Sequence, residues 1–281
     1  MSRRRWALAV TVVTVGALAG GAGPAAAQYF GRNKVQYREF DFKVVSTRHF
    51  EIYYYPEQEE FIGHVARMAE RWYDRLSQVF GADLPDRQPL IMYASSADFR
   101  QTNVLPGEFG EGTGGVTEGL RRRIIMPSAR SLAETDHVLG HELVHAFQYS
   151  LSAPSGATTA GPSILRVPLW MVEGLAEYLS LGAVDAQTAM WLRDAVESDR
   201  LPTIKDLDNP RFFPYRYGHA FWAYVAGRWG DDMVLAVFDA AMRTGDPHGA
   251  IKAVLGVDPA DFASEWHAAI RKAYAGFLEA S

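Results

Sequence analysis

Two histidines and a glutamate lie within five consecutive residues, His141-Glu142-Leu143-Val144-His145. The histidines are four residues apart, which on an α-helix is about 400° of rotation, so both imidazoles project from one face. They can share one zinc ion, which in a catalytic site needs a further protein ligand and an open position for water. Glu142 can reach a water on the metal and is expected to act as general base. The pattern therefore predicts a zinc-dependent hydrolytic site.

The third metal ligand has to come from another segment, and we expect Glu173 to provide it. Glu173 and Glu177 are also four residues apart, in a stretch (170–179) that is otherwise largely apolar. Burying two carboxylates there is costly unless each has a partner, and a zinc ion would partner Glu173. Glu177 would then accept a hydrogen bond from the outer ring nitrogen of a ligating histidine. The alternative is that both glutamates are solvated.

His137 extends the row of histidines by one turn, but three ligands from one helix are excluded by distance. Eight residues of α-helix rise about 12 Å, too far for His137 and His145 to bind one ion with bonds of about 2 Å. His137 is expected at the helix start or in the wall of the pocket. Because the chain has no cysteine, any metal is bound through nitrogen and oxygen. The predicted site holds one Zn²⁺ ion, bound by His141, His145 and Glu173.

Hydrolysis of an amide also needs a donor for the negative charge that develops on the carbonyl oxygen. The aromatic-rich segment around 212–224 offers Tyr215, Tyr217 and His219. Aromatic residues in such a segment more often belong to the core or to the rim of a site. Residue type alone therefore leaves the choice among the three open.

The elements that position these residues follow from the spacing of apolar residues. Short runs of β-branched and aromatic residues predict strands at 42–45, 49–55, 89–94 and 123–126, and a glycine-rich loop or exposed strand at 107–119. Helical spacing predicts helices at 57–80, 131–151, 165–181, 185–197, 215–229, 231–244 and 259–279. Strands followed by helices indicate an α+β fold, with a sheet-and-helix lobe at about 40–151, a mainly helical lobe at about 163–280, and a cleft between them.

The first 27 residues have the order of a secretory signal peptide. Three arginines at 3–5 precede an uncharged stretch at 6–23, and small residues follow up to Ala27. The alternative, a membrane anchor, would need about 20 strongly apolar residues, and this stretch has fewer. We therefore expect a mature domain, 28–281, that is exported to the periplasm or the cell exterior.

Composition sets further limits on the partners. Of the 281 residues, 48% are hydrophobic and 22% charged, enough for a large buried core. The formal net charge is −5, and −8 without the three arginines of the leader, which argues against a nucleic-acid partner. No segment after the leader is apolar enough to span a membrane, so no membrane association is expected once the leader is removed.

At the histidine motif and Glu173 the chain resembles the gluzincin branch of zinc metallopeptidases, the thermolysin-like set in which a His-Glu-x-x-His helix is followed by a glutamate ligand. Segments 28–37, 49–55 and 215–222 are similar to the peptidase-MA-like domain that precedes Tol-type β-propellers in exported bacterial proteins. The resemblance covers nearly the whole mature chain. It implies a zincin-like fold in which His141, His145 and Glu173 are the ligands and Glu142 is the base.

The same resemblance implies further roles. By position in the pattern, Tyr215 corresponds to the tyrosine that stabilises the transition state, and 114–118 to an edge strand that pairs with an extended substrate. The implied activity is that of an exported zinc peptidase acting on a peptide or protein. The chain carries no propeller, so any guidance that a propeller gives elsewhere is expected to be absent or to come from a separate partner protein.

Two other functions remain open at this point. One is a binding module that holds a peptide or partner, with a structural or vestigial metal site. An intact Glu142 favours the enzyme, because a purely structural site has no use for a base beside its ligands. The other is hydrolysis of a non-peptide amide, which would use the same residues.

Overall fold

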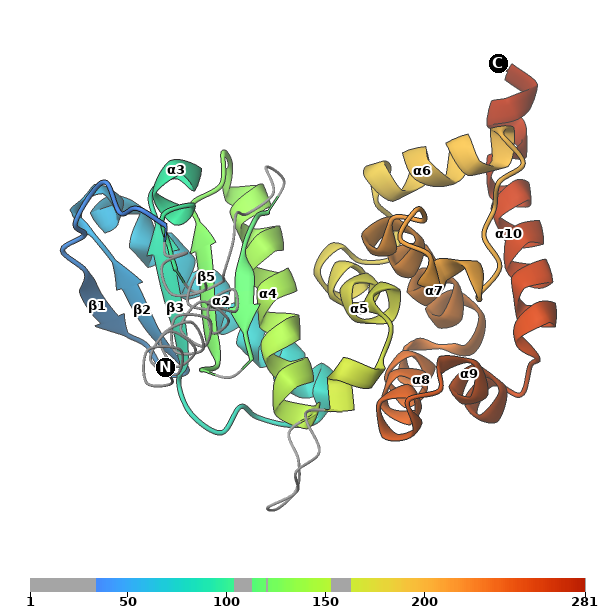
Figure 1. The fold of residues 1–281 in the computed structure, drawn as a ribbon, viewed down its shortest axis with the longest axis horizontal. Helices are drawn as coiled ribbons and strands as arrows, with labels where there is room; N and C mark the ends of the chain where they lie inside the picture. The colour runs from blue at the N-terminus through green and yellow to red at the C-terminus, as the bar shows by residue number, and fades with distance from the viewer. Residues whose placement is uncertain (1–33, 104–112, 120, 153–162, 281) are drawn as a thin grey trace, which may run out of the picture.

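The computed structural model describes residues 34–103, 113–119, 121–152 and 163–280. The predicted signal peptide, much of the glycine-rich stretch and the connection at 153–162 lie outside these ranges. Figure 1 shows a sheet with its helices on one side of the molecule and a group of helices on the other, and both views place helix α4 between the sheet and helix α5. The predicted α+β class is confirmed.

One mixed sheet organises the first part of the described chain, with the strand order β1-β2-β3-β5-β4. Its strands are β1 (Lys43–Ser46), β2 (Phe50–Tyr54), β3 (Gln88–Tyr93), β4 (Val116–Glu118) and β5 (Arg123–Pro127). The central strands β2, β3 and β5 run parallel, whereas β1 and β4 are antiparallel to their neighbours. Strand β4 therefore forms one edge of the sheet, next to α4.

One face of the sheet is fully buried and the other is partly covered. On β2 the alternate residues Phe50, Ile52 and Tyr54 are buried in the main core with α2 (Glu59–Phe80) and α4 (Leu132–Ser152). The opposite face carries a smaller cluster in which Tyr55 and Tyr93 pack against aromatic residues of the segment that precedes β1. On this second side Glu51 and Tyr53 of β2 are half-exposed, so the main core lies on the side of α2 and α4.

Helix α4 begins where the sequence predicts and is packed closely against α2. The hydroxyl of Ser131 accepts a hydrogen bond from the backbone N–H of Glu134 at 3.1 Å, which caps the first turn. Further along, a Cβ atom on Gly140 would lie 2.6 Å from the ring of Trp72 in α2. A glycine is needed there, since any side chain would push the two helices apart. The close approach holds His141, the next residue, against the core.

The described chain after α4 is helical. Its helices are α5 (Leu169–Leu181), α6 (Ala186–Glu197), α7 (Pro214–Trp229), α8 (Asp231–Thr244), α9 (Pro247–Leu255) and α10 (Pro259–Ala280), with the short helices η3 (Ser163–Arg166) and η4 (Asp206–Asp208). Two further short helices, η2 (Pro56–Gln58) and α3 (Ser96–Phe99), lie in the sheet region. None of the helices in the described ranges is long and apolar enough to cross a membrane.

Helices α5 and α7 cross with their backbones in contact. A Cβ atom on Gly174 of α5 would lie 2.3 Å from the backbone carbon of Gly218, and one on Gly218 would lie 2.0 Å from the carbonyl oxygen of Trp170. Only glycines allow this approach, because the obstacle is main chain that cannot rotate away. The crossing brings the glutamates of α5 next to the first turn of α7.

The sequence analysis did not predict the short helices α3 and η4, and two longer helices also differ from the prediction. The helix expected to start at residue 165 starts at Leu169, because Pro168 disfavours helical geometry at Val167 and is itself the extended N-cap residue of α5. Helix α9 was not predicted, although its start has a readable signal. Asp246 accepts a hydrogen bond from the N–H of Gly249, and Pro247 occupies the first helical position.

Candidate active site

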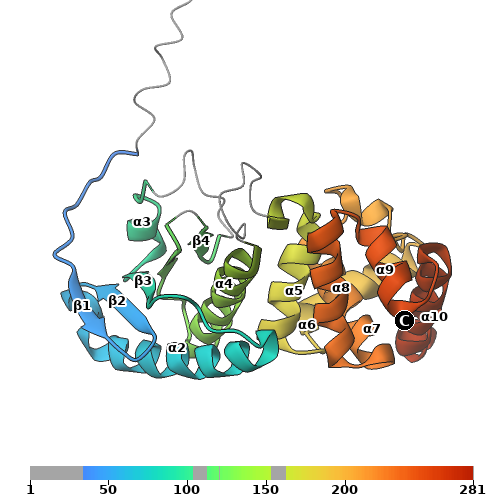
Figure 2. The same cartoon turned by 90° about the horizontal axis from the view of Figure 1, so that it is seen from below.

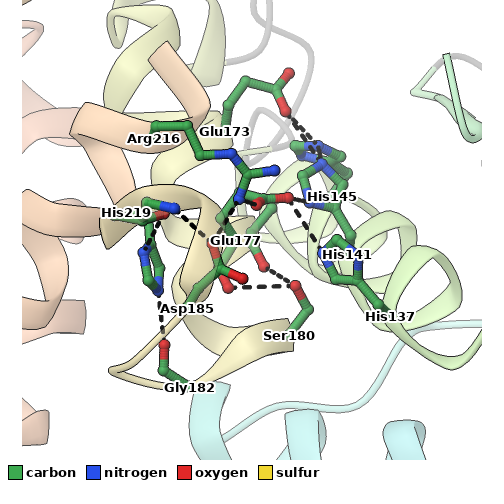
Figure 3. Close-up of polar contacts among 12 residues, drawn as sticks. His137, His141, His145, Glu173, Glu177, Ser180, Gly182, Asp185, Arg216 and His219 are labelled. Atoms are coloured by element: carbon green, nitrogen blue, oxygen red, sulfur yellow. Dashed lines mark hydrogen bonds and ion pairs between the residues drawn. The ribbon is translucent and has the colours of Figure 1, made fainter. Parts of the chain in front are cut away.

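The three expected metal ligands come together from two helices. Nε2 of His141 and Nε2 of His145 each lie 3.2 Å from Oε2 of Glu173, and the two nitrogens are 3.1 Å apart. Zinc bonds of about 2.0–2.1 Å at tetrahedral angles separate two ligand atoms by about 3.3–3.4 Å. The triangle thus has nearly the size of one face of a zinc tetrahedron. Figure 3 shows the side chains converging on this point.

The outer nitrogen of His145 is held by an acceptor. Nδ1 lies 2.8 Å from Oε1 of Gln148, and the amide nitrogen of that side chain donates to the carbonyl of Val172 at 3.1 Å. Since the second bond orients the amide, Oε1 must face the ring, and Nδ1 carries the hydrogen. In the neutral ring Nε2 then presents a lone pair to Glu173.

His141 is held in the same tautomer as His145. Its Nδ1 lies 3.0 Å from Oε1 of Glu177, poorly aligned for a hydrogen bond but close enough for a strong ionic contact. A lone pair there would be repelled by the carboxylate, so Nδ1 carries the hydrogen and Nε2 also points a lone pair inward. In the neutral rings, two lone pairs and the carboxylate of Glu173 therefore face one another, an arrangement that favours a cation between them.

The pKa values of the groups around the triangle also favour a positive charge between them. Burial alone would lower the pKa of His141, but the hydrogen bond to Glu173 and the close carboxylate of Glu177 raise it to about 10. Burial would raise the pKa of Glu173, yet the charge of His145 and hydrogen bonds to both histidines hold it far below its usual range. The site thus binds a proton tightly where a metal ion would bind. The donor set of two imidazoles and one carboxylate suits zinc.

Glu142 lies outside the triangle, beside a pocket of about 450 Å³. The pocket is lined by the residues just before β4, by α4, by α5 and by residues at the start of α7. Its lining residues are Thr113, Gly114, Gly115, His137, Val138, His141, Glu142, Glu177, Phe213, Tyr215 and Arg216. A substrate in this pocket would therefore meet the carboxylate of Glu142 and the ring of His141 together.

The sequence of this region matches a known family. Residues 121–266, a little over half of the chain, match the family described as "Peptidase of plants and bacteria". The chain belongs to this peptidase family. The matched range contains both helices that provide the triangle, and also Glu142 and Tyr215. No curated protein matches the chain.

Of the three candidate oxyanion donors, the structure brings one to the site of this peptidase. The ring of Tyr215 stacks on His141, with centroids 5.8 Å apart, and lines the pocket. Tyr217 is buried against Trp191 and Phe212. His219 is also buried, and its nitrogens contact the hydroxyl of Thr188 at 2.9 Å and the carbonyl of Gly182 at 2.7 Å. The last two side chains are therefore engaged elsewhere.

Arg216 is a residue of the site that the sequence analysis did not single out. Its Nη1 donates to Oε2 of Glu177 at 2.6 Å and to Oδ2 of Asp185 at 3.3 Å (Figure 3). Nε2 of His137 lies 3.2 Å from Oε1 of the same glutamate, Glu177. The sequence could have indicated this role. Two carboxylates in an apolar segment need a positively charged partner, and Arg216 is a cation at the start of an aromatic-rich helix.

Thr117 is the second such residue. From β4 its hydroxyl reaches Glu142, with Oγ1 2.6 Å from Oε2 and 2.8 Å from the backbone carbonyl oxygen of the same residue. No local pattern marks a threonine in a glycine-rich stretch as a partner of a glutamate 25 positions later. Only the pairing of β4 with the sheet brings the two together.

Proposed function

We propose that this chain is a zinc-dependent peptidase of the gluzincin type, in which His141, His145 and Glu173 hold one Zn²⁺ ion. The observation that carries the proposal is the triangle of two imidazole lone pairs and one carboxylate oxygen, 3.1–3.2 Å apart. Family membership supports peptide-bond hydrolysis, and the donor set supports the metal. Zinc at such a site supplies Lewis-acid chemistry, since it polarises a carbonyl and makes water more acidic.

Glu142 would act as the general base. It is buried beside His141 and lines the pocket, where it can accept a proton from the attacking water and pass it to the leaving amine. Its neighbour across the pocket, Tyr215, would stabilise the carbonyl oxygen. Burial, together with the charges of Glu173 and Glu142, raises the pKa of Tyr215, so its hydroxyl is protonated at neutral pH and can donate a hydrogen bond.

An extended peptide would bind along β4. This strand pairs with β5 on one side and is the last strand of the sheet, so its other side can accept a further strand in the described part of the fold. Thr113, Gly114 and Gly115, which lead into β4, line the pocket together with Glu142. A peptide paired with this edge would thus pass in front of the base.

The rival function, a binding module with a structural metal, is less well supported. Structural zinc sites are almost always closed by four protein ligands, whereas catalytic sites have three and keep one position open. The group formed by His141, His145 and Glu173 has three members among the residues that the structure describes. It also adjoins a pocket, which a structural site does not need.

The decisive experiment measures metal and activity together. We expect the purified protein, loaded with zinc, to hold one ion per chain and to cleave peptides in a mixed library. Glu142→Gln should keep the zinc and lose activity by about 10²–10⁴-fold, the usual contribution of a general base. Glu134→Gln, an exposed change on the same helix, is the matched control. A wild type that holds no zinc would refute the metal site, and a fully active Glu142→Gln would refute the mechanism.

We also propose that the peptidase is exported, on the basis of the leader at 1–27. The test is the mass of the protein recovered from the periplasm or medium of a bacterial host. The expected product starts at Gln28. Recovery of the full-length chain from the cytoplasm alone would contradict export without affecting the proposed activity.

A further inference from the structure

We infer that Thr117 is a positioning residue that fixes the carboxylate of Glu142 from the edge strand β4. The inference rests on the proposed function and deepens it, because it names what holds the base. Oγ1 of Thr117 lies 2.6 Å from Oε2 of Glu142 and 2.8 Å from the carbonyl oxygen of the same residue. The threonine is half-buried and does not belong to the metal-ligand group.

The hydroxyl of Thr117 has one hydrogen and two acceptors within reach. The backbone carbonyl of Glu142 already accepts the N–H four residues later, as every carbonyl inside an α-helix does. A carboxylate is the stronger acceptor, because hydrogen bonds to an ionised group are shorter and stronger than neutral ones. The hydrogen therefore goes to Oε2. This leaves Oε1 as the oxygen that receives the proton of the attacking water.

A second residue of the same segment holds the side chain of Glu142 from another side. A Cβ atom on Gly115 would lie 2.8 Å from Cγ of Glu142 and 2.9 Å from its Oε1. The carboxylate thus rests directly on the backbone at Gly115, and only a glycine leaves room for it. The hydroxyl of Thr117 limits the movement of one oxygen and the backbone at Gly115 limits the other.

The geometry of the strand explains why two residues can do this. Alternate residues of an extended chain share one face, so positions 115 and 117 both point toward α4. Threonine is branched at Cβ, which restricts its χ1 angle and keeps the hydroxyl in place. Thr117 is also anchored in the sheet, opposite Ile124 of β5. The strand proposed to bind the substrate therefore also sets the position of the base.

The first test compares Thr117→Val with Thr117→Ser in the zinc-loaded protein. Valine keeps the shape and removes the hydroxyl, so we expect kcat to fall about ten- to a hundredfold, as for loss of a hydrogen bond to a charged group, with KM unchanged. Serine keeps the hydroxyl and should restore kcat to within a few-fold. Thr244→Val removes a threonine hydroxyl that bonds a carbonyl of its own helix α8, and is the matched control.

The second test does not depend on activity or metal. Crystal structures of the metal-free wild type and of Thr117→Val should show one conformation of the Glu142 side chain in the former and a displaced or disordered carboxylate in the latter. Gly115→Ala should displace the same carboxylate, because the flexible side chain yields more easily than the strand. Gly227→Ala, where nothing lies within 4 Å of the added atom, is its control.

The outcomes separate this inference from the proposed function. If the zinc-loaded wild type cleaves no peptide, the proposed function fails, while the crystal structures still test the contact. If the wild type is active and folded Thr117→Val has the same kcat with Glu142 unmoved, the inference fails alone. Unfolding of Thr117→Val leaves the decision to Gly115→Ala, which overturns the inference if the Glu142 carboxylate stays in place.

Discussion

Two regions of the chain form the site, and their residues are brought together in different ways. Helix α4 provides His141, Glu142 and His145 from five consecutive residues, and their common orientation is a consequence of helical periodicity alone. Helices α5 and α7 provide Glu173 and Tyr215, residues far apart in the sequence. Those two meet only because Gly174 and Gly218 let the helix backbones touch. A motif can therefore be local while the site that it belongs to is not.

The largest expected effect tests whether both regions are needed for the metal. His145→Ala on α4 and Glu173→Gln on α5 should each weaken zinc binding by more than about a hundredfold, since even outer partners of ligands are worth ten- to a hundredfold. Activity should fall below detection in both. Competition with a chelator measures the affinity. If Glu173→Gln binds zinc as well as the wild type, α5 does not contribute a ligand.

The next effect tests the helix crossing itself. Gly218→Ala puts a methyl group 2.0 Å from a backbone oxygen, so α5 and α7 must separate. We expect the free energy of unfolding to fall by about 3 kcal/mol, at the upper end for overpacking, together with weaker zinc binding. Gly227→Ala on the same helix should leave stability unchanged or slightly raised. Urea unfolding of both variants measures the difference. Equal stability of the two variants would contradict the tight crossing.

A smaller effect is expected from loss of the hydrogen bond between Arg216 of α7 and Glu177, the carboxylate beside His141. Arg216→Met removes the cation from a buried carboxylate that orients His141. Zinc affinity should fall about ten- to a hundredfold, the range for outer partners of metal ligands. Arg228→Met removes an exposed arginine from the same helix and is the control. An unchanged affinity in Arg216→Met would mean that His137 and the surrounding helix suffice to hold Glu177.

The last prediction concerns the pH dependence of the metal-free protein. The pKa of His141 is about 10 in the fold against 6.5 in the unfolded chain, so its stabilisation is complete below pH 6.5 and is lost as pH rises to about 10. The pKa values of Glu173 and Glu177 are lowered from 4.5, so their contribution is lost as pH falls below that value. Metal-free protein should therefore be most stable between about pH 4.5 and 6.5.

Thermal unfolding with a chelator and with zinc checks this dependence. Zinc replaces the proton between the ligands, so the loss of stability above pH 6.5 should be smaller in the loaded protein. A metal-free protein whose melting temperature stays constant from pH 6.5 to 10 would contradict the close facing of the histidines and glutamates.

Much of the architecture was predictable because its causes are local. The cap at Ser131, the apolar spacing of α2 and α4 and the short β-branched runs each depend on neighbours a few residues away. Errors occurred where a single proline or cap decides a boundary, as at Pro168 and at the start of α9. The residues of the site were likewise predictable where their arrangement depends on local spacing. The convergence of His141 and His145 could be predicted, and the contact of Arg216 with Glu177 could have been.

The sequence by itself determined the donor atoms of the site and the helix faces that carry them, because helical periodicity relates residues four positions apart. Residue types alone left Tyr215, Tyr217 and His219 equivalent, although the family resemblance favoured Tyr215, and the sequence did not indicate the contact that Thr117 makes. Only the tertiary structure decided these points. Which residue of α7 faces His141 depends on the rotation of that helix about its axis, and the glycine crossing with α5 sets that rotation. Which residue of β4 reaches Glu142 depends on sheet register, and both are non-local contacts.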